Sequence, residues 1–160
     1  MIRRITEADA VVIAEIYNYY IENTAITFEE DPLSPDAMAR RIGETCAKYP
    51  WFVREEGGVV TGYAYANKWK DRFAYRFAVE LSLYLRKGCE GRGFGSELLG
   101  RLLDELRKTS VHAVVAVITI PNERSVALHE KFGFKEVARL NEIGYKLNRW
   151  LDVGYWELIL

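Results

Sequence analysis

The run of residues from 77 to 120 constrains the fold more than any other part of the chain. Its first segment, Phe77–Arg86, alternates apolar and polar residues, which is typical of a strand with two different faces. A glycine-rich turn leads into a helix over Phe94–Lys108, whose apolar residues recur at i, i+4 spacing. Ala113–Ile120 is unbroken and β-branched, as in a strand covered on both faces. This order predicts a βαβ unit with parallel strands and a right-handed crossover.

The remaining segments show helical and extended patterns, with no repeat or linker between them. Pro35 suits the first position of a helix, because the N–H that proline lacks has no helical partner there. The Gly57-Gly58 pair tolerates the positive φ of a tight hairpin turn. The other expected elements are a strand over Ile2–Ile5, a helix from Thr6 or Asp9 to about Asn23, a helix from Pro35 that ends before Pro50, a hairpin of Trp51–Glu56 and Val59–Trp69, a helix over Asn122–Phe132, and strands over Phe134–Ala138 and Val153–Ile159. We expect a single domain over residues 1–160 of the mixed α/β (α+β) class.

Composition and charge exclude several classes of protein. Of the 160 residues, 49% are hydrophobic and 28% charged, which is typical of a globular domain and of neither a disordered nor a membrane-embedded chain. Lys and Arg number 22 against 23 Asp and Glu, so the net charge is −1, without the basic excess of a nucleic-acid binder. The longest strongly apolar run, Ala113–Ile118, is far shorter than the ~20 residues of a membrane span. We expect neither a nucleic-acid nor a membrane partner.

Cysteine and histidine are too scarce for a disulfide scaffold or a histidine-based metal site. Cys46 and Cys89 have no histidine at metal-ligand spacing, and His112 and His129 are the only histidines. The N-terminal residues lack the apolar segment of a secretory signal. We expect no metal and a cytoplasmic location.

The segment Glu90-Gly91-Arg92-Gly93-Phe94-Gly95-Ser96 stands where the predicted helix begins. Alternating glycines let a backbone approach a ligand closely. The first N–H groups of a helix have no intrahelical partner and lie at the positive end of its dipole, so they can bind phosphate. The alternative is that these glycines only make a tight turn.

Two familiar phosphate-binding loops do not fit this segment. No Lys-Ser or Lys-Thr pair follows a glycine here, which argues against a Walker-type nucleotide-binding loop. The spacing is G-x-G-x-G and not G-x-G-x-x-G, and the loop follows a strand in the middle of a mixed sheet. A dinucleotide-binding Rossmann site is therefore disfavoured.

Several motifs in order along the chain resemble the GNAT acyltransferase superfamily. They are Leu83-Tyr84-Leu85 before the glycine loop, Asn122-x-x-Ser125, and Leu128-His129-Glu130-Lys131-Phe132-Gly133-Phe134. Further runs resemble its phosphinothricin / methionine sulfoximine N-acetyltransferase branch, among them Tyr49-Pro50-Trp51, Trp69-Lys70, Gly144-Tyr145-Lys146 and Trp150-x-Asp152-Val153-Gly154. Together these matches cover nearly the whole chain.

The resemblance implies the GNAT acyl-CoA N-acyltransferase fold, a central mixed and mostly antiparallel sheet flanked by helices, with acetyl-CoA as co-substrate. The CoA pyrophosphate is implied to lie on Gly91, Arg92, Gly93, Phe94, Gly95 and Ser96. The pantetheine arm is implied to pair with Leu83, Tyr84 and Leu85. Asn122 matches a family asparagine that contacts the CoA arm, and a plain helix N-cap is a compatible alternative.

The loop departs from the family at two positions. Glu90 stands where the family usually has Gln or Arg, and a carboxylate beside a pyrophosphate is repulsive unless it turns away. Lys87 replaces a proline that is frequent before the loop. We expect the positive charges of Lys87 and Arg92 to compensate.

Acetyl transfer needs a neutral amine, because an ammonium has no lone pair. Glu80 lies on the polar side of the strand that leads to the glycine loop and matches the proposed general base of the branch. The alternative is a solvated strand carboxylate. His129 stands where many superfamily members have a tyrosine, and an imidazole can return a proton to the leaving thiolate. A packed helix histidine is the equal alternative.

The acceptor contacts are expected just before Glu80. The branch's substrate contacts correspond best to Arg72 and Tyr75, with Arg76 beside them and Phe28 as an apolar wall. A guanidinium binds a carboxylate or phosphinate in bidentate fashion, although a solvated basic hairpin would show the same residues. We expect Trp150 and Asp152 to shape the C-terminal strand and a subunit contact, since the branch typically forms homodimers.

The sequence is thus interpreted as an acetyl-CoA-dependent N-acetyltransferase. Its acceptor is the α-amine of a small amino-acid analogue such as phosphinothricin, methionine sulfoximine or methionine sulfone. One alternative keeps the fold with another amine as acceptor, such as a polyamine, an aminoglycoside or a protein N-terminus. A second alternative is an acyl-CoA-binding module without turnover.

Overall fold

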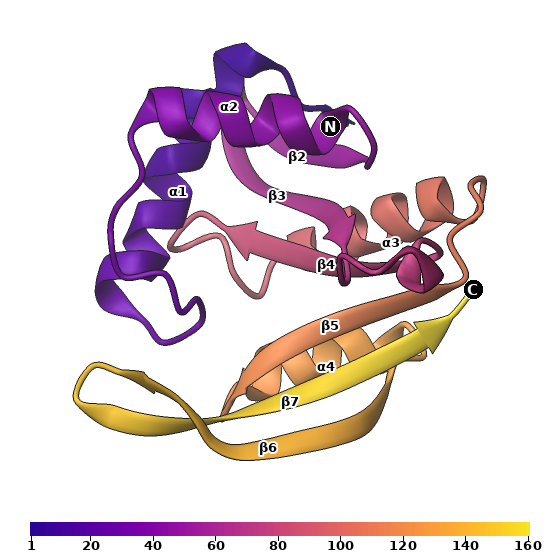
Figure 1. Ribbon diagram of the computed structural model, residues 1–160. Coiled ribbons are helices and arrows are strands. Elements are labelled where there is room, and N and C mark those ends of the chain that lie inside the picture. The colour runs from indigo at the N-terminus through magenta and orange to yellow at the C-terminus, as the bar shows by residue number, and fades with distance from the viewer.

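A seven-stranded sheet runs through the whole molecule in the strand order β1-β2-β3-β4-β5-β7-β6 (Figure 1). The computed structural model describes residues 1–160. The strands are β1 (Ile2–Arg4), β2 (Trp51–Glu56), β3 (Val59–Lys68), β4 (Ala78–Leu85), β5 (Ala113–Ile120), β6 (Lys135–Lys146) and β7 (Arg149–Ile159). The helices are α1 (Ala10–Asn23), α2 (Pro35–Cys46), α3 (Phe94–Leu106) and α4 (Glu123–Lys131), with short 3₁₀ turns η1 (Glu7–Asp9) and η2 (Phe73–Tyr75). The mixed α/β class is confirmed.

The pairing of β4 with β5 is parallel, while every other neighbouring pair is antiparallel. This confirms the βαβ unit predicted from residues 77–120. The parallel ladder is short: Ala78–Leu81 pair with Ala113–Ala116, and the two strands are unpaired beyond that point. The sheet therefore opens between the second half of β4 and the second half of β5.

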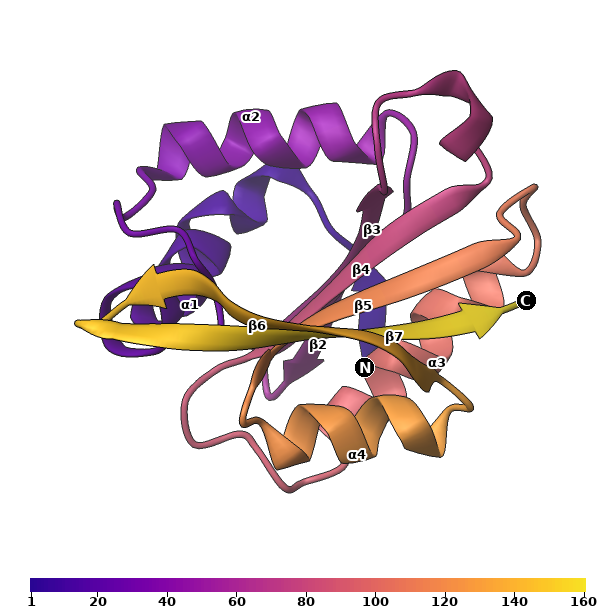
Figure 2. The same ribbon diagram turned by 60° about the horizontal axis from the view of Figure 1, so that its bottom comes forward.

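Helices cover both faces of the sheet (Figure 2). α3 lies in one hydrophobic cluster with strand residues such as Val79, Val114 and Trp156, and residues of α4 pack against the same cluster. α1 and α2 form the other cluster, with Trp51 and Val53 from the sheet. The predicted alternation in β4 follows from this layering, because Val79 is buried in the α3 cluster while Tyr84 packs against the α1–α2 cluster.

Local sequence features set three element boundaries, namely two helix caps and one hairpin turn. Ser34 caps α2, since its hydroxyl accepts a hydrogen bond from the N–H of Ala37 at 3.2 Å. Asn122 caps α4 in the same way, through the N–H of Ser125 at 3.3 Å. Gly57 and Gly58 have φ of 58° and 79°, which confirms the tight hairpin turn between β2 and β3.

The C-terminal hairpin is much longer than the predicted Phe134–Ala138 and Val153–Ile159. β6 continues to Lys146 and β7 begins at Arg149. The first nine residues of β6 are all exposed, because β6 is an edge strand and pairs only with β7. Such a strand has no buried face, so its apolar and polar residues need not alternate. Its length is set by main-chain hydrogen bonds to β7 and cannot be predicted from hydrophobic periodicity.

No helix of the structure is both long and apolar enough to cross a membrane.

The close approach of β3 to β4 requires a glycine at position 62. A Cβ atom there would lie 2.6 Å from Cδ2 of Leu85 and 2.8 Å from the carbonyl oxygen of Tyr84. The carbonyl belongs to the backbone of the neighbouring strand and cannot move away alone. We therefore expect Gly62→Ala to lower the free energy of unfolding by about 1–3 kcal/mol through overpacking, measured by urea denaturation.

Gly43→Ala in α2 is the matched control, because the nearest atom to an added Cβ lies 3.9 Å away. Replacing a helical glycine with alanine there should raise the free energy of unfolding by about 0.5–1 kcal/mol. Equal effects of the two substitutions would contradict the strand-spacing argument.

Candidate active site

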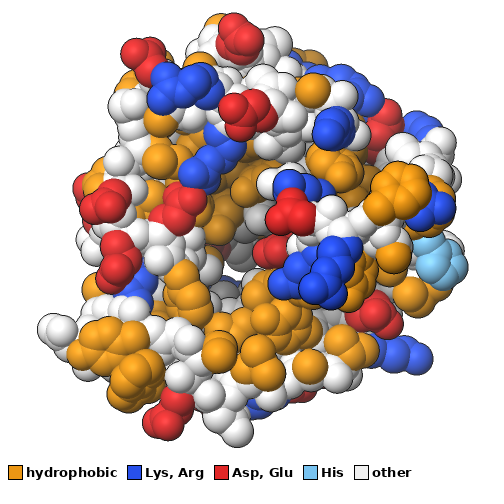
Figure 3. Space-filling model, viewed as in Figure 1, with side chains coloured by type: hydrophobic (Ala, Val, Ile, Leu, Met, Phe, Trp, Pro, Cys, Tyr) orange, Lys and Arg blue, Asp and Glu red, His pale blue; other side chains and the backbone are white.

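A cavity of about 890 Å³ opens where β4 and β5 part. Figure 3 shows the face of the molecule hollowed between the α1–α2 half and the strands β5–β7. Residues of β3, β4, β5, α2 and the loop between α1 and α2 line the cavity, together with residues of α4 from beyond the opening. The cavity therefore lies at the opening in the sheet, and residues from the α1–α2 layer and from α4 both line it.

Glu80 is a half-buried carboxylate on the cavity side of β4, one residue before the strands part. Burial raises the pKa of Glu80, and the positive charge of Lys70 opposes this shift only in part. Neither a hydrogen bond nor an ion pair engages the carboxylate. A carboxylate with these properties binds a proton more readily than an exposed one, as a general base must.

His129 also reaches the cavity, from α4. The residue is 5% exposed, and Nδ1 lies 2.7 Å from the carbonyl oxygen of Ser125. That oxygen can only accept, so Nδ1 carries the proton and the buried, unpartnered Nε2 presents a lone pair. Burial lowers the pKa of His129, which favours this neutral form. In the resting protein Nε2 is an acceptor and not a donor.

The glycine loop has the backbone geometry that a phosphate-binding turn needs. Gly91 and Gly93 have φ of 76° and 85°, and Gly93 immediately precedes α3. The N–H groups of Phe94, Gly95 and Ser96, in the first turn of α3, make no hydrogen bond within the protein. They are free to donate to an anion.

Charged side chains around the loop are arranged so that Glu90 does not oppose an anion there. The Glu90 carboxylate accepts a hydrogen bond from the N–H of Gly88 at 2.8 Å, so it turns back into its own loop. Arg92 pairs with Glu56 at 2.6 Å and stacks on Phe94. The departure of Glu90 from the family pattern is thereby accommodated.

Arg54 is a residue of this region that sequence reasoning missed. Its guanidinium lies 3.2 Å from the centre of the Phe94 ring and donates to Glu97 at 2.9 Å. Both partners belong to the first turn of α3, so a buried arginine of β2 anchors the start of that helix. No local signal identifies it, because β2 and α3 meet only in the tertiary structure.

The predicted pantetheine strand lies at the cavity only in part. Leu83 and Tyr84 line it, as does Asn122, which also caps α4. Leu85 lies outside the lining, and its carbonyl oxygen accepts a hydrogen bond from the Tyr20 hydroxyl at 2.6 Å.

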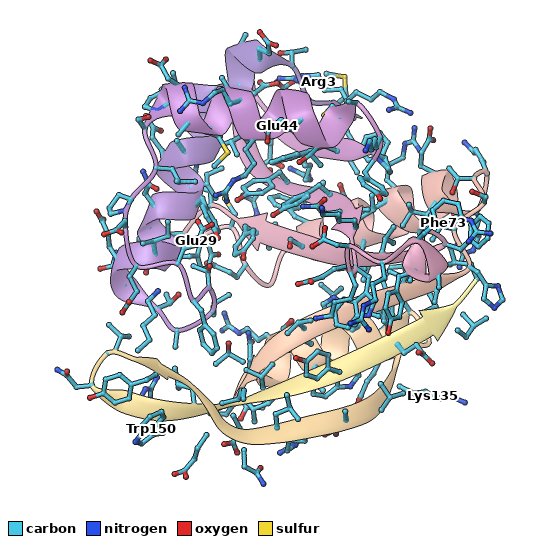
Figure 4. All side chains as sticks on the ribbon, in the orientation of Figure 1. Arg3, Glu29, Glu44, Phe73, Lys135 and Trp150 are labelled. Carbon is cyan, nitrogen blue, oxygen red and sulfur yellow. The ribbon has the colours of Figure 1, made fainter.

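The predicted acceptor residues divide in the same way. Phe28 lines the cavity, whereas Arg72, Tyr75 and Arg76 do not. Arg76 stacks on Phe73 and Phe77 at 4.3 and 4.2 Å, in the exposed turn that holds η2. Figure 4 shows the labelled Phe73 on this turn, outside the cavity. The role of these three residues stays a prediction.

Two cations in and just after α2 line the cavity and were not predicted from the sequence. Arg41 and Lys48 come from α2 and its C-terminal end, with Glu44 between them at i, i+3, i+7 spacing. Arg41 forms an ion pair with Glu29 of the α1–α2 loop at 2.8 Å. The spacing was visible in the sequence, but a solvated helix face produces the same pattern.

The sequence matches the acetyltransferase (GNAT) domain family over residues 2–154. It is 39% identical over 156 residues to the phosphinothricin N-acetyltransferase of Streptomyces viridochromogenes, with 98% of this chain and 85% of the relative covered. It is 38% identical over 160 residues to the L-methionine sulfoximine/L-methionine sulfone acetyltransferase of Salmonella typhimurium, with 99% and 94% covered.

A solved structure is similar to the whole fold. It is described as an acetyltransferase from Salmonella typhimurium with its cofactor acetyl-CoA, and it shares 37% identity with this chain. The superposition has a TM-score of 0.98 and covers 100% of this chain and 93% of the other. The match over residues 2–154 and these full-length similarities confirm the predicted family: the chain belongs to the GNAT acetyltransferases.

Proposed function

We propose that the protein transfers the acetyl group of acetyl-CoA to the α-amine of a small amino-acid analogue of the phosphinothricin, methionine sulfoximine or methionine sulfone type. The observation that carries this proposal is the unpaired, half-buried carboxylate of Glu80 at the point where β4 and β5 part. The two curated relatives named above act on acceptors of this class according to their names.

The donor side of the site fits acetyl-CoA. The free N–H groups of Phe94, Gly95 and Ser96 can donate to the pyrophosphate, with Arg92 beside them. The unpaired edge of β4 at Leu83 and Tyr84 offers main-chain groups to the amide-containing arm. When bound, the thioester supplies the acetyl carbonyl that the amine attacks.

Glu80 takes the proton that the acceptor amine must lose, directly or through one water. The α-amine of a peptide has a pKa of about 8 and that of a free amino acid lies higher, so near pH 7 most of the acceptor is protonated and unreactive. Because the pKa of Glu80 is raised, it differs less from the pKa of the amine, which favours proton transfer between the two groups. His129 completes the proposal as the second proton carrier. After the amine attacks the thioester its nitrogen must lose a second proton, which the free Nε2 can take up and pass to the leaving thiolate.

Phe28 supplies an apolar wall for the acceptor. A carboxylate or phosphinate on the acceptor is bound by cations, for which we propose Arg72 and Arg76 with the phenol of Tyr75, as the resemblance implies. The proposal places the enzyme in the cytoplasm, where acetyl-CoA is available, with Cys46 and Cys89 as free thiols.

We further propose that the protein acts as a homodimer through its C-terminal hairpin. Tyr145, Leu147 and Trp150 are 56%, 50% and 62% exposed, and Val137 is 56% exposed on the same hairpin. Figure 3 shows apolar side chains gathered over this hairpin, and Figure 4 shows the labelled Trp150 at its outer side. An exposed apolar group of this kind on one element is typical of an interaction surface.

Glu80→Gln tests the base. We expect kcat with methionine sulfoximine to fall by about 10²–10⁴-fold, because the amide cannot accept the amine proton, while the KM for acetyl-CoA stays unchanged. The assay follows release of the free CoA thiol with a panel of amines, and Glu22→Gln on α1 is the exposed control. Release only with polyamines, aminoglycosides or peptides would replace the proposed acceptor, and acetyl-CoA binding without any release would overturn the enzymatic proposal.

The same substitution should stabilise the protein at neutral pH. A raised folded-state pKa means that the contribution of Glu80 to stability is full below its ordinary value of 4.5 and is lost as the pH rises through the raised value. We therefore expect Glu80→Gln to unfold at higher urea concentration than the wild type at pH 7.5, with the difference vanishing near pH 4. A variant less stable than the wild type at pH 7.5 would contradict the unpaired carboxylate.

Sedimentation velocity tests the dimer. The mass of the wild type from sedimentation should be twice the chain mass of 18.5 kDa. Trp150→Glu should sediment as a monomer, because a dimer would bury its charge in the contact. Val11→Glu, at an exposed apolar position of α1, is the control and should leave the dimer intact. A monomeric wild type would dismiss the contact.

A further inference from the structure

The loop of residues 24–34 forms one wall of the cavity without any helix or strand of its own. Ile26, Thr27, Phe28 and Glu29 of this loop all line the cavity. Short polar contacts order it internally: the Thr27 hydroxyl accepts from the N–H of Glu29 at 3.3 Å and shares a hydrogen bond of 2.8 Å with the Tyr17 hydroxyl. The bond to Tyr17 ties the loop to α1, and the ion pair of Glu29 with Arg41 ties it to α2.

The opposite side of the loop is held by a buried lysine at the end of β6. Lys146 is 4% exposed, and its Nζ donates to the carbonyl oxygen of Thr27 at 2.7 Å. No carboxylate forms an ion pair with it. A buried ammonium is costly unless it is hydrogen-bonded, so the single bond to Thr27 binds the loop firmly to the hairpin.

Gly144 receives the ring of Phe28 directly. A Cβ atom on Gly144 would lie 2.3 and 2.4 Å from two carbons of that ring. The ring therefore lies against the bare backbone of β6, and only glycine leaves room for it there. Phe28 is thus placed between the cavity and the hairpin.

A bulge in β6 brings Gly144 to this position. Leu140 pairs with Val153 and Gly144 pairs with Leu151, so three residues of β6 stand opposite one residue of β7. Asp152 stabilises the bulge by accepting a hydrogen bond from the N–H of Glu142 at 2.8 Å. Bulges re-aim the strand that follows them, and here the residues after the bulge meet the cavity loop.

We propose that Gly144 and Lys146 are positioning residues for the acceptor, which set where Phe28 and Thr27 lie in the cavity wall. The inference rests on the proposed function in one respect, namely that the acceptor occupies the end of the cavity beside Phe28. Neither residue lines the cavity itself, so both act through the loop. The C-terminal hairpin thereby determines the shape of a site formed largely by distant segments.

Gly144→Ala tests the contact with Phe28. Ordinary contact with a Cβ begins at 3.4 Å, so the ring must move by about 1 Å towards the cavity. We expect kcat/KM for the acceptor to fall by about 10–100-fold, mainly through KM, while the KM for acetyl-CoA stays unchanged. Gly43→Ala is the control for a glycine replacement without a close neighbour.

A double-substitution cycle separates this effect from general destabilisation. In a Phe28→Ala background no ring remains to be displaced, so Gly144→Ala should have almost no further effect on kcat/KM. An equal loss in both backgrounds would overturn the role of Gly144 in positioning Phe28.

Lys146→Met tests the second contact, with Lys135→Met as the matched control on the exposed end of the same strand (Figure 4). Hydrogen exchange of the amides of residues 25–33, measured in the enzyme without ligands, should accelerate in Lys146→Met and not in Lys135→Met. The KM for the acceptor should rise in parallel. Unchanged exchange in Lys146→Met would overturn the proposal.

The exchange measurement needs no substrate, so it remains decisive if the wild type acetylates none of the proposed amino acids. That outcome would dismiss the proposed acceptor, while the contact between Lys146 and Thr27 would still be tested on its own. Accelerated exchange together with an unchanged KM for an acetylated acceptor would show that the loop is held but does not position the substrate, and it would also overturn the proposal.

Discussion

The parting of β4 and β5 is the constraint on which the other functional features depend. Two parallel strands that stay paired for only four residues leave main-chain groups without partners along the rest of each strand. Buried main-chain N–H and C=O groups need hydrogen-bond partners, so such an opening is tolerated where a ligand or water can supply them. The same opening brings His129 and Glu80 to one cavity, although α4 lies on one face of the sheet and the Glu80 side of β4 faces the α1–α2 layer on the other.

Several polar groups near this opening lack full hydrogen bonding. Glu80 has no partner for its carboxylate, Nε2 of His129 is buried without a hydrogen bond, and Lys146 has a single carbonyl. Elsewhere the buried charged residues are well paired, as Asp9 is with Arg3. Such groups beside a cavity are typical of a site that binds and reacts, since a carboxylate without an ion pair accepts a proton more readily than a paired one.

Much of the donor side was predictable from local sequence. Alternation along β4 placed Glu80 on the opposite face from the leucines, and Gly91 and Gly93 predicted the positive φ that their turn requires. The cations near the cavity were much less predictable. Lys146 lies far along the chain from Arg41 and Lys48, and an exposed helix or edge strand shows the same residues whether or not a cavity lies beside it.

By itself the sequence determined the order and type of the elements, the parallel β4–β5 unit, the glycine turn before α3 and the family. The elements, the parallel unit and the glycine turn follow from periodicity, capping and backbone conformation, which act over a few residues. The family follows from the motifs that the chain shares with it. Only the tertiary structure decided where β4 and β5 separate, how far β6 extends, and that its bulge brings Gly144 against Phe28. Gly144 and Phe28 are 116 positions apart in the chain, and the geometry of all three features depends on the packing of the entire sheet.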